Sequence, residues 1–426
     1  MNQIKNKRIF EKAKNQLKWV CFFIAYPYWT LIQNLSFFLA IRFVFTAKQL
    51  PLEFLRIRSV LSFAGLLLIF GAINSTLGAA INLGYDYFRL SIIILPNYIY
   101  WGLIVIVLGN IGLKFLPLTS FYRYFFYAII ASILTYFFFT PIFVNIPFFR
   151  NLSQNNFAFV LIIFGPMATA YVQSEWKNNL YSLTFIILIT VAGFLSGSRS
   201  GSIFTLTGCL TVMALGNWIK IVLVTFFGIF LSIAAPEIAD STIVKATVHS
   251  LNERTYSLIY ESEETLNTDK SYLTRLAMIE KGMNIFEQYP LAGIGIGNFS
   301  NKSFKIDFNF EGAELLIQKE DEYEKNINPH NSYISFLSEG GIILFIPFAI
   351  CMFYPLLYFL FNFPQIKNED RAVFISILFM CIHSWFITGM VNVYGWFIIG
   401  IANSYIIHKK NSTRIAVNEV RIPLPQ

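Results

Sequence analysis

Long uninterrupted apolar segments constrain the fold of this chain more than any other feature of its sequence. One of them runs from Ser59 to Leu83, with no alternation of polar and apolar residues. About 20 apolar residues suffice for a helix to cross a bilayer, where every backbone polar group needs a partner. Charged residues make up 13% of the chain, against about 25% in soluble domains. These features exclude a soluble enzyme and argue against an outer-membrane barrel. We therefore predict an all-α polytopic membrane protein.

Ten segments are long or apolar enough to predict membrane helices. They are 59–83, 91–112, 121–144, 157–174, 180–196, 202–215, 217–236, 333–361, 372–390 and 392–408. Residues 19–46 leave two alternatives open, because they are short for two crossings of about 17–20 residues each. A tight hairpin that turns at Gln33-Asn34 is the interpretation we favour; a single span or an interfacial segment is the alternative. We expect about 10–12 transmembrane helices.

The net charge of +8 is distributed unevenly along the chain. Residues 237–329 carry nine Lys and Arg against sixteen Asp and Glu, whereas the remainder has a net charge of +15. Excess Lys and Arg in short loops marks the cytoplasmic side of a membrane protein, so we interpret the charge as an orientation signal and not a nucleic-acid signal. The predicted domains are N-terminal membrane helices (1–236, with the hairpin at 19–46), a large outer loop with amphipathic helices (237–332), C-terminal membrane helices (333–408) and a cytoplasmic tail (409–426).

A polar turn at 196–201, with the sequence SGSRSG, joins two predicted membrane helices on the outer side. The helix predicted after it, 202–215, covers about 21 Å of a hydrocarbon core of about 30 Å, so the turn should lie below the headgroups. Arg199 there suits a phosphate or carboxylate, because its guanidinium donates two parallel hydrogen bonds. Ser198 and Ser200 add hydroxyl donors. The alternative is an interfacial arginine that reaches the lipid phosphates.

Residues 274–286 predict an amphipathic helix in the outer loop, because apolar residues recur there at helical spacing. These residues are Leu276, Ile279, Met283 and Phe286. Arg275 and Lys281 lie on this helix and either bind an anion or belong to a solvated face. The segment 293–298, with the sequence GIGIGN, lacks the GxGxxG spacing and the βαβ context of a nucleotide loop. We interpret it as a backbone turn packed close to the membrane helices.

His330 lies in a third polar segment, Pro329–Tyr333, which opens the predicted helix 333–361. Asn331 or Ser332 should cap that helix, but capping does not explain a histidine. Imidazole at the mouth of a membrane cavity suits a general base near neutral pH. Glu339 follows nine residues later and either holds a hydrogen-bond network or faces the cavity. His383 lies inside another apolar run, and we expect a core or lipid-facing residue there.

These three segments resemble, in their order, the bacterial O-antigen ligase/polymerase family of membrane glycosyltransferases. The resemblance rests on SGSRSG at 196–201, TRLAMIEKGMNIFEQYPLAGIGIGNF at 274–299 and PHNSYISFLSEGG at 329–341, and it covers about residues 180–350. A further glycine that is often seen just downstream in the family is missing here, which leaves the subfamily open. The resemblance implies a transferase with no metal ion and no cofactor, on the outer face of the bacterial cytoplasmic (inner) membrane.

By the same resemblance, Arg199 and Arg275 would hold a diphosphate, and His330 would activate an acceptor hydroxyl. The implied donor is a glycan on undecaprenyl pyrophosphate, and candidate substrate-binding residues are Ser198, Ser200, Asn298, Asn331 and Glu339. The acceptor is another lipid-linked glycan in a polymerase, which we favour, or the lipid A core in a ligase. Membrane lipid and a chain-length regulator protein are further candidate partners; no nucleic acid is expected. A transporter or flippase for the lipid-linked glycan is the alternative of another class.

Overall fold

The computed structural model describes residues 2–26, 55–139, 154–177, 179–196, 198–215, 270–300, 329–388, 390 and 392–420. These residues form helices and turns, and no strand occurs among them. The predicted span 217–236 and most of 19–46 lie outside the described residues. The protein is an all-α polytopic membrane protein, as predicted.

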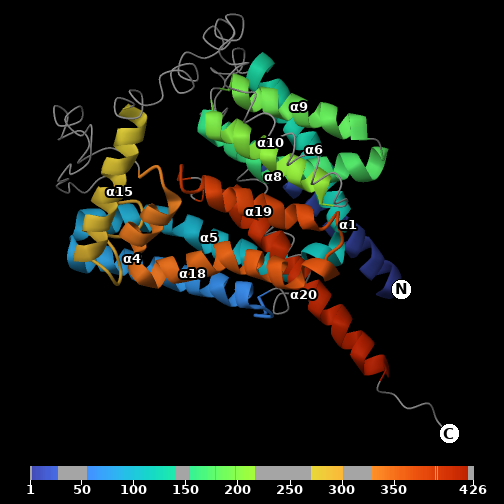
Figure 1. Cartoon of the computed structure of the whole chain (residues 1–426). Coiled ribbons are helices and arrows are strands. Elements are labelled where there is room, and N and C mark those ends of the chain that lie inside the picture. Colours follow the sequence, from blue (N-terminus) through green and yellow to red (C-terminus); the bar gives the residue numbers. More distant parts are fainter. Residues whose placement is uncertain are drawn as a thin grey trace, which may run out of the picture.

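Thirteen helical elements occur in the described part of the chain (Figure 1). They are α1 (Asn2–Ala25), α4 (Val60–Asn82), α5 (Tyr85–Phe115), α6 (Leu118–Leu134), the π-helix η1 (Thr135–Phe139), α8 (Gln154–Trp176), α9 (Asn179–Leu195), α10 (Arg199–Ala214), α15 (Lys270–Gln288), α18 (Ser332–Asn362), the 3₁₀ helix η2 (Phe363–Gln365), α19 (Arg371–His383) and α20 (Val393–Val420). Each predicted span within the described residues coincides with a helix. Two of the predicted spans differ clearly from their helices in where they end. The helix predicted at 372–390 is shorter, because α19 ends at His383 and a turn follows, and the helix predicted at 392–408 is longer, because α20 continues to Val420.

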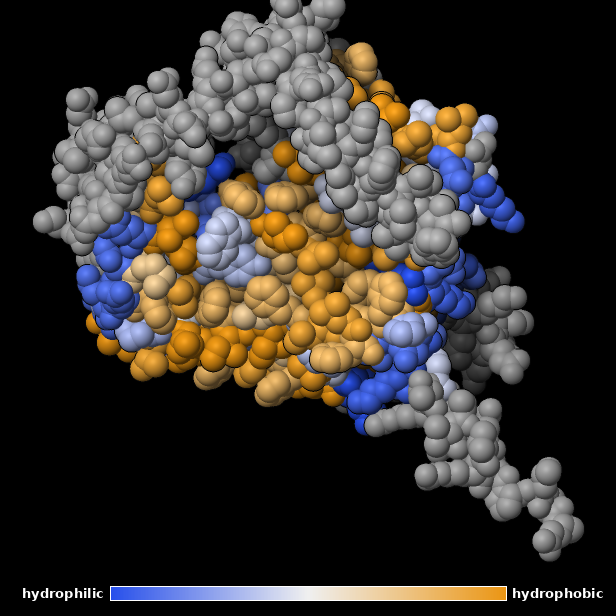
Figure 2. Space-filling model, viewed as in Figure 1, coloured by the Kyte–Doolittle hydropathy of each residue, from blue (hydrophilic) through white to orange (hydrophobic). Residues whose placement is uncertain are grey.

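Five of the described helices are long and apolar enough to cross a membrane, namely α4, α5, α6 with η1, α8 and α18. Three further apolar helices, α9, α10 and α19, are shorter. Figure 2 shows the apolar side chains as a broad band across the middle of the molecule, with hydrophilic residues gathered towards its two ends. This distribution is what a bilayer requires of the surface of a helical bundle.

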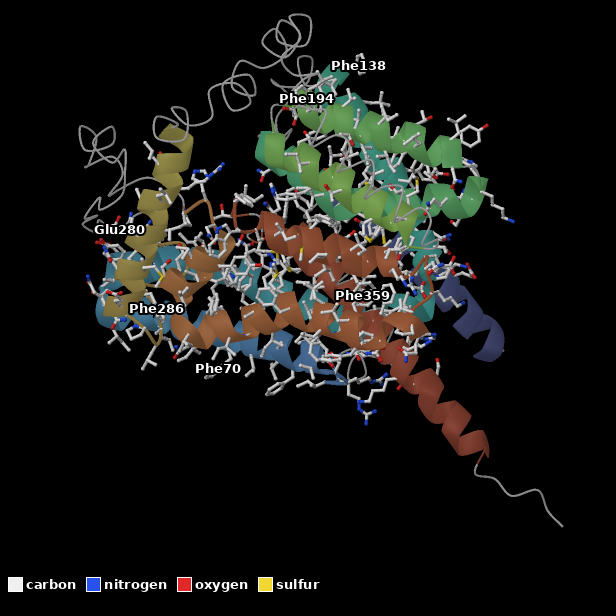
Figure 3. The ribbon with its side chains drawn as sticks, viewed as in Figure 1. Phe70, Phe138, Phe194, Glu280, Phe286 and Phe359 are labelled. Atoms are coloured by element: carbon white, nitrogen blue, oxygen red, sulfur yellow. The ribbon has the colours of Figure 1, made fainter. Side chains whose placement is uncertain are left out.

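The bundle has two distinct ends, which we name by what they carry. The α15 end carries α15, the start of α18 and the end of α19, because the Ser332 amide donates to the Ser384 carbonyl at 2.8 Å. The terminal end carries both chain ends (Figure 1). It also holds the end of α10 beside the start of α19, since the Arg371 guanidinium donates to the Leu215 carbonyl at 2.8 Å. Figure 3 shows Phe286 of α15 and Phe359 of α18 towards opposite ends.

The core of the bundle combines aromatic rings with small residues at helix crossings. The rings of Trp101 and Trp396 stack with centroids 5.6 Å apart, and those of Phe336 and Phe348 stack at 4.0 Å. Where α4 crosses α5, a Cβ on Gly65 would lie 2.9 Å from a backbone oxygen of α5. Close approach of this kind gives membrane helices the van der Waals contact that holds them together.

Helix α18 is broken near its first third, at Gly341, where φ is +59°. An L-residue with a side chain rarely adopts this conformation, so glycine is the residue that permits the break. The break frees amides of the following turn, and the loop after α15 satisfies them: Ile342 donates to the Pro290 carbonyl at 2.9 Å, and Ile343 to the Leu291 carbonyl at 3.3 Å. The turn of α18 that follows the break is therefore fixed to the segment after α15.

Candidate active site

Four helix ends converge at the α15 end and bring the predicted site segments together. Gly282 of α15 packs so closely on the start of α18 that a Cβ there would overlap Ile334. The start of α18 is hydrogen-bonded to the turn after α19. The end of α19 contacts α10, because the ring of His383 lies 5.7 Å from that of Phe204. The segments around Arg199, Arg275 and His330 thus share one end of the bundle.

His330 lies between Pro329 and the cap of α18, in a backbone conformation that is uncommon for its type. Its φ is +48°, and strain of this kind costs of order 1–3 kcal/mol and is found most often at functional sites. The imidazole is half-buried. Burial, and then the positive charge of Arg275, hold the pKa of His330 below its usual value. His330 is therefore a neutral base at neutral pH, and the guanidinium of Arg275 acts on it directly.

Asn331 is the cap of α18, as one of the two predicted alternatives required. Its side-chain oxygen accepts hydrogen bonds from the amides of Tyr333 at 2.9 Å and Ile334 at 3.1 Å. This arrangement satisfies two of the amides that a helix start leaves without partners. The side-chain nitrogen of Asn331 is buried and has no hydrogen-bond partner among the described residues. The cap therefore uses the side-chain oxygen of Asn331, and the side-chain nitrogen could donate hydrogen bonds to another molecule.

The prediction of a turn at Arg199 and Ser200 is wrong. Both belong to the first turn of α10, which begins at Arg199, because the Ser202 amide closes the first helical bond onto the Ser198 carbonyl at 3.1 Å. The positive end of the helix dipole therefore lies at this segment. The side chains of Arg199 and Ser200 lie outside the described part of the structure. The Ser198 hydroxyl is buried and has no partner among the described residues.

The glycine-rich segment 293–298 is a backbone turn packed on the membrane helices, as predicted. Three of its glycines have positive φ, between +67° and +90°. The amides of Ile294 and Gly295 donate to the carbonyls of Ser338 and Glu339 on α18, at 3.2 and 2.9 Å. The side-chain nitrogen of Asn298 donates to Ser91 and to backbone oxygens of α5 and of the turn itself. Asn298 thus fastens this turn to α5.

Glu339 holds this turn from the other side. Its carboxylate accepts the Phe299 amide at 3.0 Å and also hydrogen bonds from the Gly297 backbone and the Ser335 side chain. The side chain is 6% exposed. The structure therefore bears out the first of the two alternatives for Glu339, a hydrogen-bond network, while direct contact of Glu339 or Asn298 with substrate stays a prediction.

The predicted helix at 274–286 is confirmed as α15, and it stops at Gln288 just before Pro290. Its buried face consists of Leu273, Ala277, Met278, Lys281 and Ile285. Lys281 is fully buried, so a solvated helix face is the wrong interpretation for it. Its ammonium lies 4.9 Å from the centre of the Phe299 ring, a cation–π contact that helps to offset burial of the charge. Figure 3 shows Glu280 on the same helix, with its side chain at the left edge of the molecule.

His383 is a core residue, the first of the two alternatives that the sequence left open for it. It is fully buried at the end of α19, with its ring stacked on Phe159 at 5.9 Å. The charge of Arg275 acts on His383 as well as on His330. A lone histidine in an apolar run gives no sign in the sequence of a nearby cation. The position of α15 in the folded chain brings Arg275 near His383.

The model of a family described as O-antigen ligase matches residues 183–349, a region that includes all three site segments. No curated protein matches the chain.

Proposed function

We propose that this protein, in which residues 183–349 match a family described as O-antigen ligase, transfers or polymerises a glycan carried on undecaprenyl pyrophosphate. The reaction takes place at the outer face of the bacterial cytoplasmic membrane, where the α15 end lies. We favour a polymerase, which joins the glycan to a second lipid-linked glycan. A ligase, which joins it to the lipid A core, shares the same chemistry and differs in the acceptor.

The observation that carries this proposal is that Arg275 lies close enough to His330 at the α15 end for its charge to lower the pKa of the imidazole. The guanidinium binds the diphosphate of the donor and stabilises the negative charge that grows as it leaves. The neutral imidazole accepts the proton of the acceptor hydroxyl. That oxygen forms the new bond to the anomeric carbon while the bond from this carbon to the diphosphate breaks. A diphosphate is a good leaving group, so positioned cations and one base suffice without a metal ion.

The remaining candidates orient these groups. Arg199 is the second diphosphate cation, with Ser198 and Ser200 as hydroxyl donors beside it at the positive end of α10. Asn331 offers its free side-chain nitrogen to the substrate next to His330. Asn298 and Glu339 act through the turn at 293–299, which keeps α15 and therefore Arg275 at a fixed position against α18. Holding reactants and charges in place in this way is a large part of the catalysis of group transfer.

Reconstitution tests the function directly. The purified protein in lipid vesicles is given lipid-linked repeat units with and without a lipid A core acceptor, and the products are separated by size. A ladder without the acceptor identifies a polymerase, and transfer only with the acceptor identifies a ligase. Movement of the glycan across the bilayer without any new glycosidic bond would overturn the proposal in favour of a transporter.

The sidedness is tested separately by labelling. In whole cells, an Arg199→Cys variant should react with a membrane-impermeant thiol reagent added from outside, because α10 begins at the α15 end. The four native cysteines are buried, so the unsubstituted protein is the matched background. Labelling confined to inverted vesicles would contradict the orientation.

A further inference from the structure

The described part of the bundle contains a second imidazole close to the proposed reaction centre, that of His383. It is fully enclosed at the end of α19, with Phe159 of α8 on one side and Phe204 of α10 on the other, at centroid distances of 5.9 and 5.7 Å. Phenylalanine would fill this space with the same ring packing. The two ring nitrogens of His383 therefore need an explanation other than packing.

Both ring nitrogens of His383 are buried without a hydrogen-bond partner among the described residues. Buried polar side-chain atoms are bonded in the large majority of cases, and each exception in a native protein calls for a reason. Leaving a buried donor or acceptor unpaired costs stability, whereas an apolar residue of the same shape does not. We expect a histidine that lowers stability in this way where a ligand completes its hydrogen bonds.

The neighbours of His383 share the same property. The Ser384 hydroxyl and the side-chain nitrogen of Asn331 are buried and also lack partners among the described residues. A hydrogen bond of 2.8 Å from the Ser332 amide to the Ser384 carbonyl holds their two segments together. Three unpaired polar side chains therefore lie on two adjoining segments. The unpaired hydroxyl of Ser376, which lies earlier on α19, belongs to no such group.

The position of this group relative to Arg275 indicates which part of a substrate it meets. The guanidinium charge acts on both His330 and His383, so His383 lies within electrostatic range of the residue that we assign to the diphosphate. Its own members are a hydroxyl, an amide and an imidazole, and none of them carries a fixed charge. Such groups match the hydroxyls of a sugar ring better than they match a second phosphate.

We propose that His383, with the Ser384 hydroxyl and the Asn331 amide, binds hydroxyl groups of the sugar that is joined to the diphosphate of the donor. This inference rests on the proposed function and adds to it the residues that recognise the sugar. The imidazole positions the sugar ring between the diphosphate cations and His330. It follows that His383 affects binding of the glycan-bearing donor and leaves binding of the bare lipid diphosphate unchanged.

The test compares His383→Phe, which keeps the ring packing, with Ser376→Ala. Ser376 lies seven residues earlier on the same face of α19, so it is a matched unpaired polar group away from Arg275. For each full-length purified variant, the KM for a lipid-linked repeat unit is measured. The rise in melting temperature caused by that donor, and by undecaprenyl pyrophosphate alone, is measured in parallel.

For His383→Phe we expect a KM at least about tenfold higher, as the loss of one or two hydrogen bonds predicts, and a smaller melting shift with the glycan-bearing donor. The shift with the bare lipid diphosphate and the melting temperature of the free protein should not fall. Ser376→Ala should match the wild type throughout. A His383→Phe variant with unchanged KM, or one that loses both shifts equally, would refute the inference.

His383→Gln keeps hydrogen-bonding capacity and should recover part of the binding even if the phenylalanine variant folds poorly. A glutamine variant as weak as the phenylalanine variant speaks against a binding role. Failure of the proposed function looks different: the wild type itself would then form no glycosidic bond. If the glycan-bearing donor also does not stabilise the wild type, both proposals are refuted. If the donor stabilises the wild type and His383→Phe removes this effect, the sugar-binding site is supported although the proposed reaction is not.

Discussion

Two buried polar groups, one at each end of the bundle, differ in how far their hydrogen bonds are satisfied. At the terminal end, the Asn403 side-chain nitrogen donates to Ser62 at 3.1 Å and to the Val105 carbonyl at 2.8 Å, and its oxygen accepts from Ser59 at 2.6 Å. At the α15 end, His383 and its neighbours have atoms without partners among the described residues. Satisfied groups hold a fold together, whereas buried groups with spare capacity suit a substrate.

The arginines Arg371 and Arg275 also differ between the two ends. Its guanidinium at the terminal end donates to the carbonyls of Ile366, Leu215 and Phe363 at 3.1, 2.8 and 3.2 Å, and it lies 3.9 Å from the centre of the Phe363 ring. All of these contacts join the ends of helices, so this arginine is structural. Arg275 instead acts on two imidazoles of the proposed site. Substitutions at the α15 end should therefore cost activity, and those at the terminal end should cost stability.

The largest effect is expected for His330→Ala. Removing a general base lowers the rate about 100- to 10,000-fold, with little change in melting temperature because the imidazole is only half-buried. The initial rate of glycan transfer measures the effect. His408→Ala, a change of an exposed histidine near the terminal end, is the control. A rate within tenfold of the wild type would remove His330 from the role of base.

A smaller effect is expected for Arg199→Lys. Lysine keeps the charge but cannot donate two parallel hydrogen bonds, so we expect a loss of about 10- to 100-fold in kcat/KM. The matched control is Arg89→Lys, because Arg89 is an exposed arginine on α5. Near-normal activity of Arg199→Lys would show that bidentate binding of the diphosphate is not needed.

At the terminal end, Asn403→Leu should lower stability and spare catalysis. The change leaves Ser59 and Ser62 without their shared partner, which costs about 1–3 kcal/mol. Thermal unfolding in detergent, followed through the loss of helix, measures the stability. The rate per folded molecule should stay within about twofold of the wild type. A large loss of rate with unchanged stability would break the comparison between the two ends.

The smallest effect is a shift in the pH profile of Arg275→Met. The charge of Arg275 lowers the pKa of His330, so the basic form persists below the usual value of about 6.5. Without this charge the pKa rises, and the residual activity should be lost at a higher pH on the acid side. The pH dependence of kcat/KM measures the shift, with Arg89→Met as the control. An acid limb that stays in place or moves to lower pH would contradict this effect of Arg275 on His330.

Much of the fold could be predicted because its signals are local. The apolar run at 59–83 predicted α4 within a residue or so at each end, since hydropathy and length decide whether a segment spans a bilayer. The cap at Asn331 followed from its own type and position. The glycine-rich turn was predicted because Gly293, Gly295 and Gly297 permit positive φ. The start of α10 was misplaced, because a polar SGSRSG segment gives no sign that its second half is helical.

The three segments of the candidate site could be predicted from the sequence. The positions of their residues relative to one another could not. The sequence by itself determined the membrane class, most of the helices that the structure describes, and a set of arginines and a histidine in segments whose order resembles one family. Only the tertiary structure decided that α18 breaks at Gly341, that Glu339 holds the turn after α15, and that Arg275 lies near both His330 and His383. These features depend on hydrogen bonds and charges between residues far apart in the chain, and no local pattern of side chains specifies them.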